Sequence, residues 1–308
     1  MFSKTFTEYF HVVFTLPHAL NALAQGNPRV IYTLLFRAAA ETLLAFGRDP
    51  RHLGGTIGIT AILHTWSQTL TEHVHVHCLV TGGALSRDRS RWIHGRAAFL
   101  FPVEALSIVF RAKYLEGLHD AFQAGQLTFA ADTTPLADAA RFAALVTQLW
   151  ATPWVVYAKQ PFGGPAQVLT YLGRYTHRIA ISNARLVSLV DGVVQFRWKD
   201  YADRGHTKIM ALDVDEFLRR FLLHVLPRGF VRIRHFGLLA NRQRRTLIAR
   251  ARDLLAAPAP AQTAADARAP DVDPTRCPFL PPGPLAGRDP APARAPTRTR
   301  RTRHVLTP

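Results

Sequence analysis

The stretch "EHVHVHCLV", residues 72–80, places three histidines at every second position, with valines between them and an apolar run behind. The valines favour extended backbone, and the strict alternation has the period of a β-strand. Successive side chains of a strand point to opposite faces of a sheet, so His73, His75 and His77 share one face. The stretch therefore predicts a β-strand whose three imidazoles line a single face.

Imidazoles placed in this way can hold a metal ion. Histidines two positions apart on a strand lie about 7 Å from each other along the backbone, and their rings can converge on one ion. Neutral imidazole suits Zn, Mn, Ni, Cu and Fe, so the strand does not identify the metal. The alternative is an ordinary polar face of a half-buried strand. Three histidines in strict alternation favour the metal site.

The whole chain has the size and composition of an intracellular globular protein. Its 308 residues can bury a sizeable core in one large or two small domains, and 48% of them are hydrophobic. No uninterrupted apolar run reaches the length of a membrane span, and the N-terminus lacks the layout of a signal peptide. Two cysteines, Cys78 and Cys277, cannot form a disulfide framework or a Cys-based zinc module. We therefore expect a cytoplasmic protein with no membrane partner.

A strong positive charge indicates a polyanionic partner. The chain has 38 Lys and Arg against 21 Asp and Glu, a formal net charge of +17, and most of the basic residues are Arg. The planar guanidinium donates two hydrogen bonds at once to a phosphate. A charge of this size attracts nucleic acid at a distance. An Arg-rich composition is also typical of high-GC genomes, but the clustering of the charge favours nucleic acid.

Beyond the histidine strand, the apolar spacing predicts further strands and helices along the chain. The strands are expected at 9–16, 56–66, 154–159, 185–190, 193–198 and 206–211. The helices are expected at 29–47, 102–124, 137–150, 166–178, 213–226 and 236–255. From residue 256 the composition changes, since twelve of the 21 prolines lie in 256–308. Such a segment cannot bury enough apolar surface to offset its ordering entropy, so we expect a disordered tail.

A second constellation lies in "QVLTYLGRYTHRIAIS", residues 167–182, where Tyr171 and Tyr175 are four apart on an expected helix and share one face. Arg174 and Arg178 stand beside them. A tyrosine hydroxyl is a weak nucleophile at neutral pH. A cation that polarises a phosphate, or an Arg that stabilises the phenolate, makes its attack feasible. On its own, this spacing is better explained by two amphipathic core or surface residues.

The C-terminal part of the expected folded region carries a block of arginines. In "RGFVRIRHFG", residues 228–237, Arg alternates with apolar residues, so an extended ribbon can present Arg232 and Arg234 on one side. The block continues with Arg242, Arg244 and Arg245. We expect these side chains to grip DNA phosphates and to set register without reading sequence. The alternative is a solvated basic face.

Together these motifs are more specific than each is alone. Over residues 9–255 the sequence resembles the transposases of the insertion-sequence-ninety-one family, two-tyrosine HUH enzymes related to rolling-circle replication initiators. The motifs that carry the resemblance are "HVVFTLPHAL", "AILHTWSQTLTEHVHVHCLVTGGALS", "YLGRYTHRIAISNARL" and "FLRRFLLHVLPRGFVRIRHFGLLANRQRR". Members usually carry an N-terminal Cys-rich zinc-binding segment before the first strand. This sequence begins almost at that strand and has no such cluster, so we expect the segment to be lacking.

The resemblance implies an α+β fold of the HUH endonuclease type. In that fold a central antiparallel sheet is flanked by helices, the histidine motif lies on a middle strand, and the tyrosines lie on a helix facing it. We expect a catalytic domain over residues 1–211 and a basic helical DNA-binding extension over 212–255. Residues 256–308 are expected to form the disordered Pro/Ala/Arg-rich tail.

The resemblance also implies a set of metal ligands. His75 and His77 match the family's histidine–hydrophobe–histidine motif. The third ligand is open among His64 on the preceding strand, His73 and His177, and we favour His64. A divalent metal, Mg or Mn, is the expected cofactor.

The implied activity is metal-dependent cleavage of single-stranded DNA at transposon ends and target. It leaves a 5′-phosphotyrosine on Tyr171 or Tyr175 and a free 3′-hydroxyl, and Arg174 and Arg178 are expected to contact the DNA. Two other functions stay open: a truncated, inactive remnant that binds DNA, and a His-ligated metal nuclease that uses water. The nuclease would usually need a carboxylate near the metal, and Glu72 is the only one in the histidine strand. The oligomeric state is not indicated.

Overall fold

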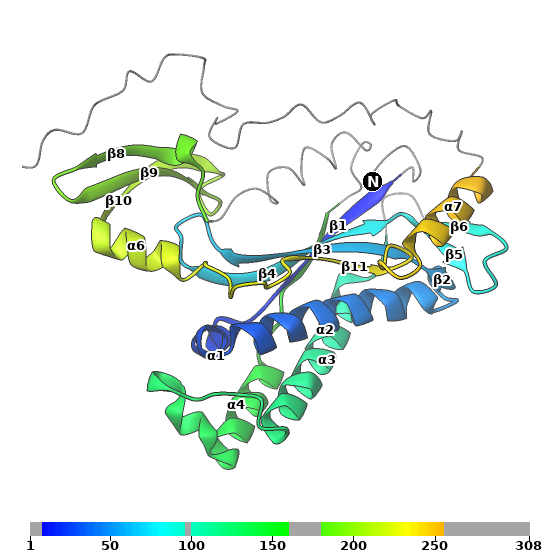
Figure 1. The fold of residues 1–308 in the computed structure, drawn as a ribbon, viewed down its shortest axis with the longest axis horizontal. Coiled ribbons are helices and arrows are strands. Elements are labelled where there is room, and N and C mark those ends of the chain that lie inside the picture. Colours follow the sequence, from blue (N-terminus) through cyan, green and yellow to red (C-terminus); the bar gives the residue numbers. More distant parts are fainter. Residues whose placement is uncertain (1–7, 96–99, 160–179, 256–308) are drawn as a thin grey trace, which may run out of the picture. The chain divides into compact units, whose positions relative to one another are not determined.

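A five-stranded antiparallel sheet forms the centre of the fold (Figure 1). The computed structural model describes residues 8–95, 100–159 and 180–255, and all statements about structure refer to these ranges. The strands follow the order β11-β3-β4-β1-β7 across the sheet. Their bounds are β1 Tyr9–Thr15, β3 Gly58–Trp66, β4 Glu72–Thr81, β7 Val156–Lys159 and β11 Ile233–Gly237. The histidine strand β4 is therefore the middle strand of an antiparallel sheet, which confirms the predicted α+β architecture.

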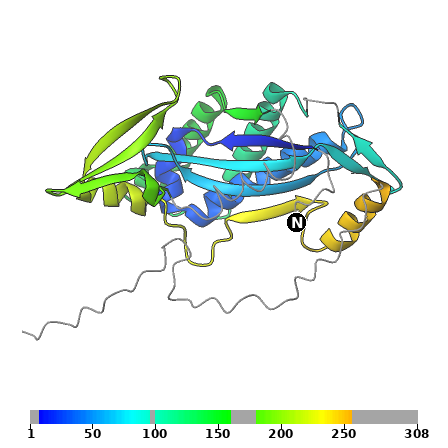
Figure 2. The ribbon, with the colours of Figure 1, turned by 90° about the horizontal axis from the view of Figure 1, so that it is seen from above.

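Helices cover one face of this sheet (Figures 1 and 2), and the side chains on that face are apolar. Phe14 of β1, Leu63 of β3 and Val76 of β4 are fully buried in one cluster with Phe36 and Phe110 from the helices. The alternation of each strand places these residues on a single side. The elements that cover or adjoin this side are η1 His18–Leu20, α1 Asn21–Gly26, α2 Pro28–Arg48, α3 Val103–Gln123, η2 Ala131–Ala137 and α4 Ala139–Ala151.

Helix α2 is long and apolar enough to cross a membrane by length and composition alone. In the structure, however, 61% of its most apolar window is buried inside the protein. Its residues Ile31, Leu35 and Leu43 are fully buried in the same cluster as the sheet. The apolar character of α2 is therefore accounted for by its place in the core.

Two smaller sheets lie beside the central one. The first has the order β10-β9-β8, with β8 Leu186–Val190, β9 Val193–Asp200 and β10 His206–Asp213; η3 Asn183–Arg185 precedes it and α6 Val214–Leu222 follows it. The second has the order β2-β5-β6, with β2 Gly55–Thr56, β5 Gly83–Ser86 and β6 Trp92–His94. Helix α7, Arg244–Leu254, packs its Leu247 against Tyr9 and Leu79 on the opposite face of the central sheet from α2 and α3.

The predicted helix over 236–255 is wrong in its first part. Residues 233–237 form β11, which pairs with β3, and α7 begins only at Arg244. The reason is tertiary pairing: the backbone of β11 finds its hydrogen-bond partners in the sheet, and Gly237 at φ 61° then turns the chain away. The predicted boundary after residue 211 falls inside β10. The predicted helix at 166–178 and the predicted tail at 256–308 lie outside the described residues.

We predict that Gly237→Ala destabilises the protein strongly. A Cβ at this position would collide with the carbonyl oxygen of Ile57, and the left-handed backbone adds its own strain. The free energy of unfolding should fall by about 3 kcal/mol or more, measured by urea denaturation. Gly229→Ala is the matched control, because Gly229 has φ 75° but no atom within 4 Å of an added Cβ, and it should cost only about 1 kcal/mol. Equal losses in the two variants would contradict the steric explanation.

Candidate metal centre

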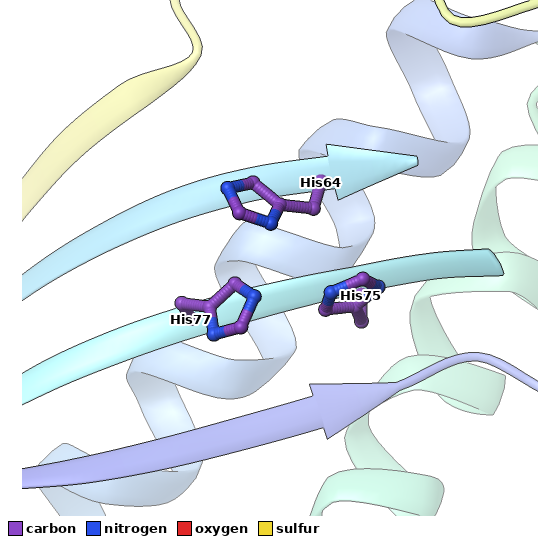
Figure 3. A group of neighbouring side chains, drawn as sticks. All are labelled: His64, His75 and His77. Atoms are coloured by element: carbon purple, nitrogen blue, oxygen red, sulfur yellow. The ribbon is translucent and has the colours of Figure 1, made fainter. Parts of the chain in front are cut away.

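Three histidine side chains converge on the face of the central sheet opposite α2 and α3. His64 comes from β3, and His75 and His77 come from β4. His64 and His75 are direct cross-strand partners, and one ring nitrogen from each of the three residues lies within 4.8 Å of the others. Figure 3 shows the three rings gathered over the two neighbouring strands. The structure therefore brings together the three residues that were selected from the sequence as metal ligands.

Burial keeps the imidazoles of His75 and His77 neutral. The relative exposures of His64, His75 and His77 are 2%, 8% and 8%. Burial lowers the pKa of His75 to about 3, with the neighbouring His73 contributing in the same direction. Burial also lowers the pKa of His77 well below its usual value, followed by the effect of His64 and His75. A neutral imidazole keeps a lone pair, which is the form that binds metals.

Hydrogen bonds orient two of the three rings. The Nδ1 atom of His75 lies 2.6 Å from the carbonyl oxygen of His73. A carbonyl can only accept, so Nδ1 carries the proton and Nε2 holds the lone pair. The Nδ1 atom of His77 lies 2.8 Å from Nε2 of His11, and the two rings stack with centroids 5.1 Å apart. When His77 donates in this bond, its Nε2 keeps a lone pair for a ligand, as metal-binding histidines commonly do.

The donor set fits a divalent transition-metal ion. Three imidazoles from two adjacent strands leave the remaining coordination positions to other ligands, as in catalytic metal sites. Within the described part of the chain, the group of metal-binding side chains holds only histidines. The carboxylate of Glu72, the acidic residue of β4, instead accepts a hydrogen bond of 2.6 Å from Nε2 of Gln25. The residues present can therefore hold a metal ion without an acidic ligand.

A pocket of about 490 Å³ opens beside the three histidines. Its aromatic and basic walls come from the end of β3, from β9 and from the turn after β9: Trp66, Trp198, Lys199 and Tyr201. Trp66 stacks on His64, with ring centroids 4.7 Å apart and an interplanar angle of 16°. The guanidinium carbon of Arg232 lies 5.4 Å from the centre of the Trp66 ring, so Arg232 stands close to the histidines.

The other predicted DNA contacts lie elsewhere. Arg234 lies over Phe36 at 4.5 Å and donates to Thr33 of α2, so the structure separates it from Arg232. Arg242, Arg244 and Arg245 gather at the start of α7. The positions of four predicted residues lie outside the described residues: Tyr171, Arg174, Tyr175 and Arg178. Whether the two tyrosines face the histidines therefore stays a prediction.

Some residues of this region were missed by sequence reasoning. His11 lies on β1, and only the register that pairs Val13 with His77 places it next to the metal-binding face. The pairing register between β1 and β4 cannot be predicted from the sequence. Trp198, Lys199 and Tyr201 lie in "FRWKDY", residues 196–201, where aromatic and basic residues interleave. This pattern is typical of surfaces that bind single-stranded nucleic acid and was a usable signal.

Comparison with known proteins identifies relatives of the chain. Residues 58–246, more than half of the chain, match a protein-family model described as "Putative transposase". The chain is 53% identical to "Putative transposase y4qJ" of Sinorhizobium fredii (strain NBRC 101917 / NGR234), over 84% of this chain and 66% of that protein. It is 29% identical to "Transposase for insertion sequence element IS801" of Pseudomonas savastanoi pv. phaseolicola, over 75% of this chain and 54% of that protein. The chain thus spans about two thirds of the length of the first relative and about half of the length of the second. No solved structure matches it.

We predict that the three histidines bind Mn²⁺ or Co²⁺ and that His11 tunes the affinity. His75→Ala should weaken the dissociation constant at least 100-fold, because a ligand is lost. His11→Ala should weaken it about 10- to 100-fold, because the orienting partner of His77 is lost. Isothermal titration calorimetry of the full chain measures both. His94→Ala, which changes an exposed histidine on β6, is the control and should bind as the original chain does. Unchanged binding by His75→Ala would remove the assignment.

The metal-free protein should lose stability in acid. The folded pKa of His75 is about 3, below its usual 6.5, so the unfolded chain binds more protons between these values. Above pH 6.5 the histidine is neutral in the folded and the unfolded chain, so it takes nothing from the free energy of unfolding. Below pH 6.5 the free energy of unfolding falls by up to about 1.4 kcal/mol per pH unit for each such histidine. Urea denaturation at a series of pH values measures the slope. The slope should be shallower in His75→Asn, and an equal slope would contradict the role of His75.

Proposed function

The chain belongs to the family of the "Putative transposase" model, which confirms the predicted family, and on this premise we propose that it cuts and transfers single-stranded DNA at the ends of a mobile element. One observation carries the proposal. Three buried imidazoles converge beside a pocket with aromatic and basic walls, within a member of this family. Such a centre is suited to a phosphodiester, because it can hold a cation beside groups that bind bases and phosphates.

We propose Tyr171 and Tyr175 as the nucleophiles. The phenolic oxygen attacks a DNA phosphorus, the bond from that phosphorus to the 3′ oxygen breaks, and the tyrosine proton ends on the released 3′ oxygen. The products are a 5′-phosphotyrosine and a free 3′-hydroxyl. The broken bond is replaced by one of similar energy, so no nucleoside triphosphate is needed. A second tyrosine can accept a second strand, and reversal of the step rejoins the DNA.

His64, His75 and His77 would hold the divalent metal. When bound, the ion supplies polarisation of the scissile phosphate. The carbonyl of His73 and the ring of His11 orient two of these ligands, and burial keeps them unprotonated at neutral pH. Of the two metals expected from the sequence, Mn fits better than Mg, because imidazole donors favour transition metals and Mg prefers oxygen ligands.

The start of α7 and the turn between β5 and β6 form the proposed grip on DNA phosphates. Arg242 and Arg245 are exposed there, and Arg244 is half-buried. The Nε atom of Arg250 donates to the carbonyl oxygen of Arg89 at 2.9 Å, so the helix and the turn are joined. Arg232 is proposed to contact DNA next to the histidines. The arginines fix the position of the backbone without reading its sequence. The proposed place of action is the bacterial cytoplasm, where chromosomal DNA lies.

The decisive experiment is covalent capture of DNA. The full chain is incubated with Mn²⁺ and labelled single-stranded oligonucleotides that span candidate element ends, and denaturing gels are read for a protein–DNA adduct. We expect a metal-dependent adduct that disappears in the Tyr171→Phe/Tyr175→Phe double variant and falls at least 100-fold in His75→Ala/His77→Ala. The two single tyrosine variants show which residue acts first.

Tyr157→Phe is the matched tyrosine control. Tyr157 lies on β7 of the same sheet and is 56% exposed, so it tests whether another accessible tyrosine is the one that reacts. The adduct should survive in this variant. Cleavage that persists without both proposed tyrosines would instead indicate a metal nuclease that uses water. DNA binding with no adduct under any condition would indicate a binding protein without catalytic activity.

A further inference from the structure

We infer that Trp198 and Tyr201 form a stacking site for an unpaired nucleobase next to the histidine centre, with Lys199 and Arg197 placed for its phosphate. The inference rests on the proposed function, because it takes single-stranded DNA as the ligand. It assigns to β9 and the turn after it a part in holding the strand near the bond that is cut.

The pockets of this region support a shared binding path. The pocket beside the histidines, of about 490 Å³, and a second pocket of about 420 Å³ have five lining residues in common. These shared residues are Trp66, Gln68, Trp198, Lys199 and Tyr201. The second pocket continues to Arg185, Arg197 and Thr207. A single strand of DNA that lies against the shared residues would therefore reach the histidines at one end and a basic wall at the other.

The available aromatic rings are those of β9 and its turn. Trp66 is already engaged, since it stacks on His64 and lies under Arg232. Trp198 packs partly against the small cluster of Leu70, Ala180 and Phe196 and still lines both pockets. Tyr201 is 72% exposed and lines both pockets, so its ring is accessible to a ligand. Base stacking on such rings is strong and tolerates any base, because every base has a π-face.

The charges of the wall are arranged for an anion. Arg197 and Lys199 form no salt bridge with any residue that the structure describes, and both side chains are exposed. Lys208 offsets part of the nearby acidic charge, because its ammonium lies 2.8 Å from Asp200 and 2.9 Å from Asp203. Two cations thus remain for a phosphate beside two aromatic rings. This combination of stacking and charge fits a nucleotide of a single strand better than a neutral or purely apolar ligand.

The wall is held firmly against the histidine centre. The β3–β4 loop, residues 67–71, joins the two histidine strands, and η3, α6 and the segment after α6 anchor it. The guanidinium of Arg185 donates to the carbonyl of Gln68, Arg220 donates to that of Thr69 at 3.2 Å, and Nε2 of His224 donates to that of Leu70 at 3.0 Å. A site built from anchored elements loses little entropy when it binds a strand.

Binding without catalysis tests the inference. The full chain carrying Tyr171→Phe/Tyr175→Phe, without metal, is titrated against a fluorescent oligo(dT) of about twelve nucleotides, and the dissociation constant is read from anisotropy. Adding Trp198→Ala should weaken binding about tenfold, while Trp198→Phe should keep most of the affinity. Trp150→Ala is the matched control, because Trp150 is a half-exposed tryptophan on α4 that lies under Arg111, and it should leave binding unchanged.

An abasic oligonucleotide of the same length and charge separates stacking from a general loss of structure. Removal of the bases should weaken binding to the protein that retains Trp198. It should change the dissociation constant little in the Trp198→Ala variant. Equal losses for both oligonucleotides, or oligo(dT) binding that Trp198→Ala leaves intact, would overturn the inference. If adducts form in the capture assay while Trp198→Ala binds normally, only this inference fails. If Trp198 carries base-dependent binding and no adduct forms, the inference stands and the nucleophile assignment fails.

Discussion

The position of β4 in the middle of the central sheet is the constraint on which the site depends. Because β1 and β3 pair with it on both sides, its backbone groups are satisfied and its register is fixed. Its alternation then sends Val74 and Val76 into the core and His75 and His77 to the opposite face. A slip of one residue would exchange the two faces, so the burial of the valines also fixes where the imidazoles lie. Hydrophobic packing on one side of the strand thereby determines the chemistry on the other.

The same packing sets the electrostatics of the centre. His75 and His77 lie within the sheet with little exposure, so desolvation holds them neutral, and neighbouring imidazoles act in the same direction. Isolated buried imidazoles would be costly, but here the carbonyl of His73 and the ring of His11 satisfy one nitrogen of each. The remaining donors face a pocket rather than the core. Burial therefore shields the centre from water, while the adjacent pocket leaves it accessible to a ligand.

Much of this arrangement could be predicted from the sequence, because strict alternation and helical spacing are local signals. The strand of His75, its middle place in an antiparallel sheet and the pairing of His64 were expected on this basis or from the family resemblance, and the structure agrees. What could not be predicted depends on register between distant segments. His11 meets His77 across 66 residues, and the extended ribbon expected at 228–237 finds its partner in β3, about 170 residues earlier in the chain. The roles of Tyr171 and Tyr175 stay predictions, since they lie outside the described residues.

The place of β11 has a consequence for the order of events during synthesis. Strand β3, which carries His64, pairs on its outer side with a segment that emerges from the ribosome about 170 residues later. Until then β3 is an open edge, and such edges readily pair with other chains. A nascent chain in which β3 and β4 pair before β11 is made would have one unpaired border beside His64, so the pairing of β11 also protects the sheet from other chains.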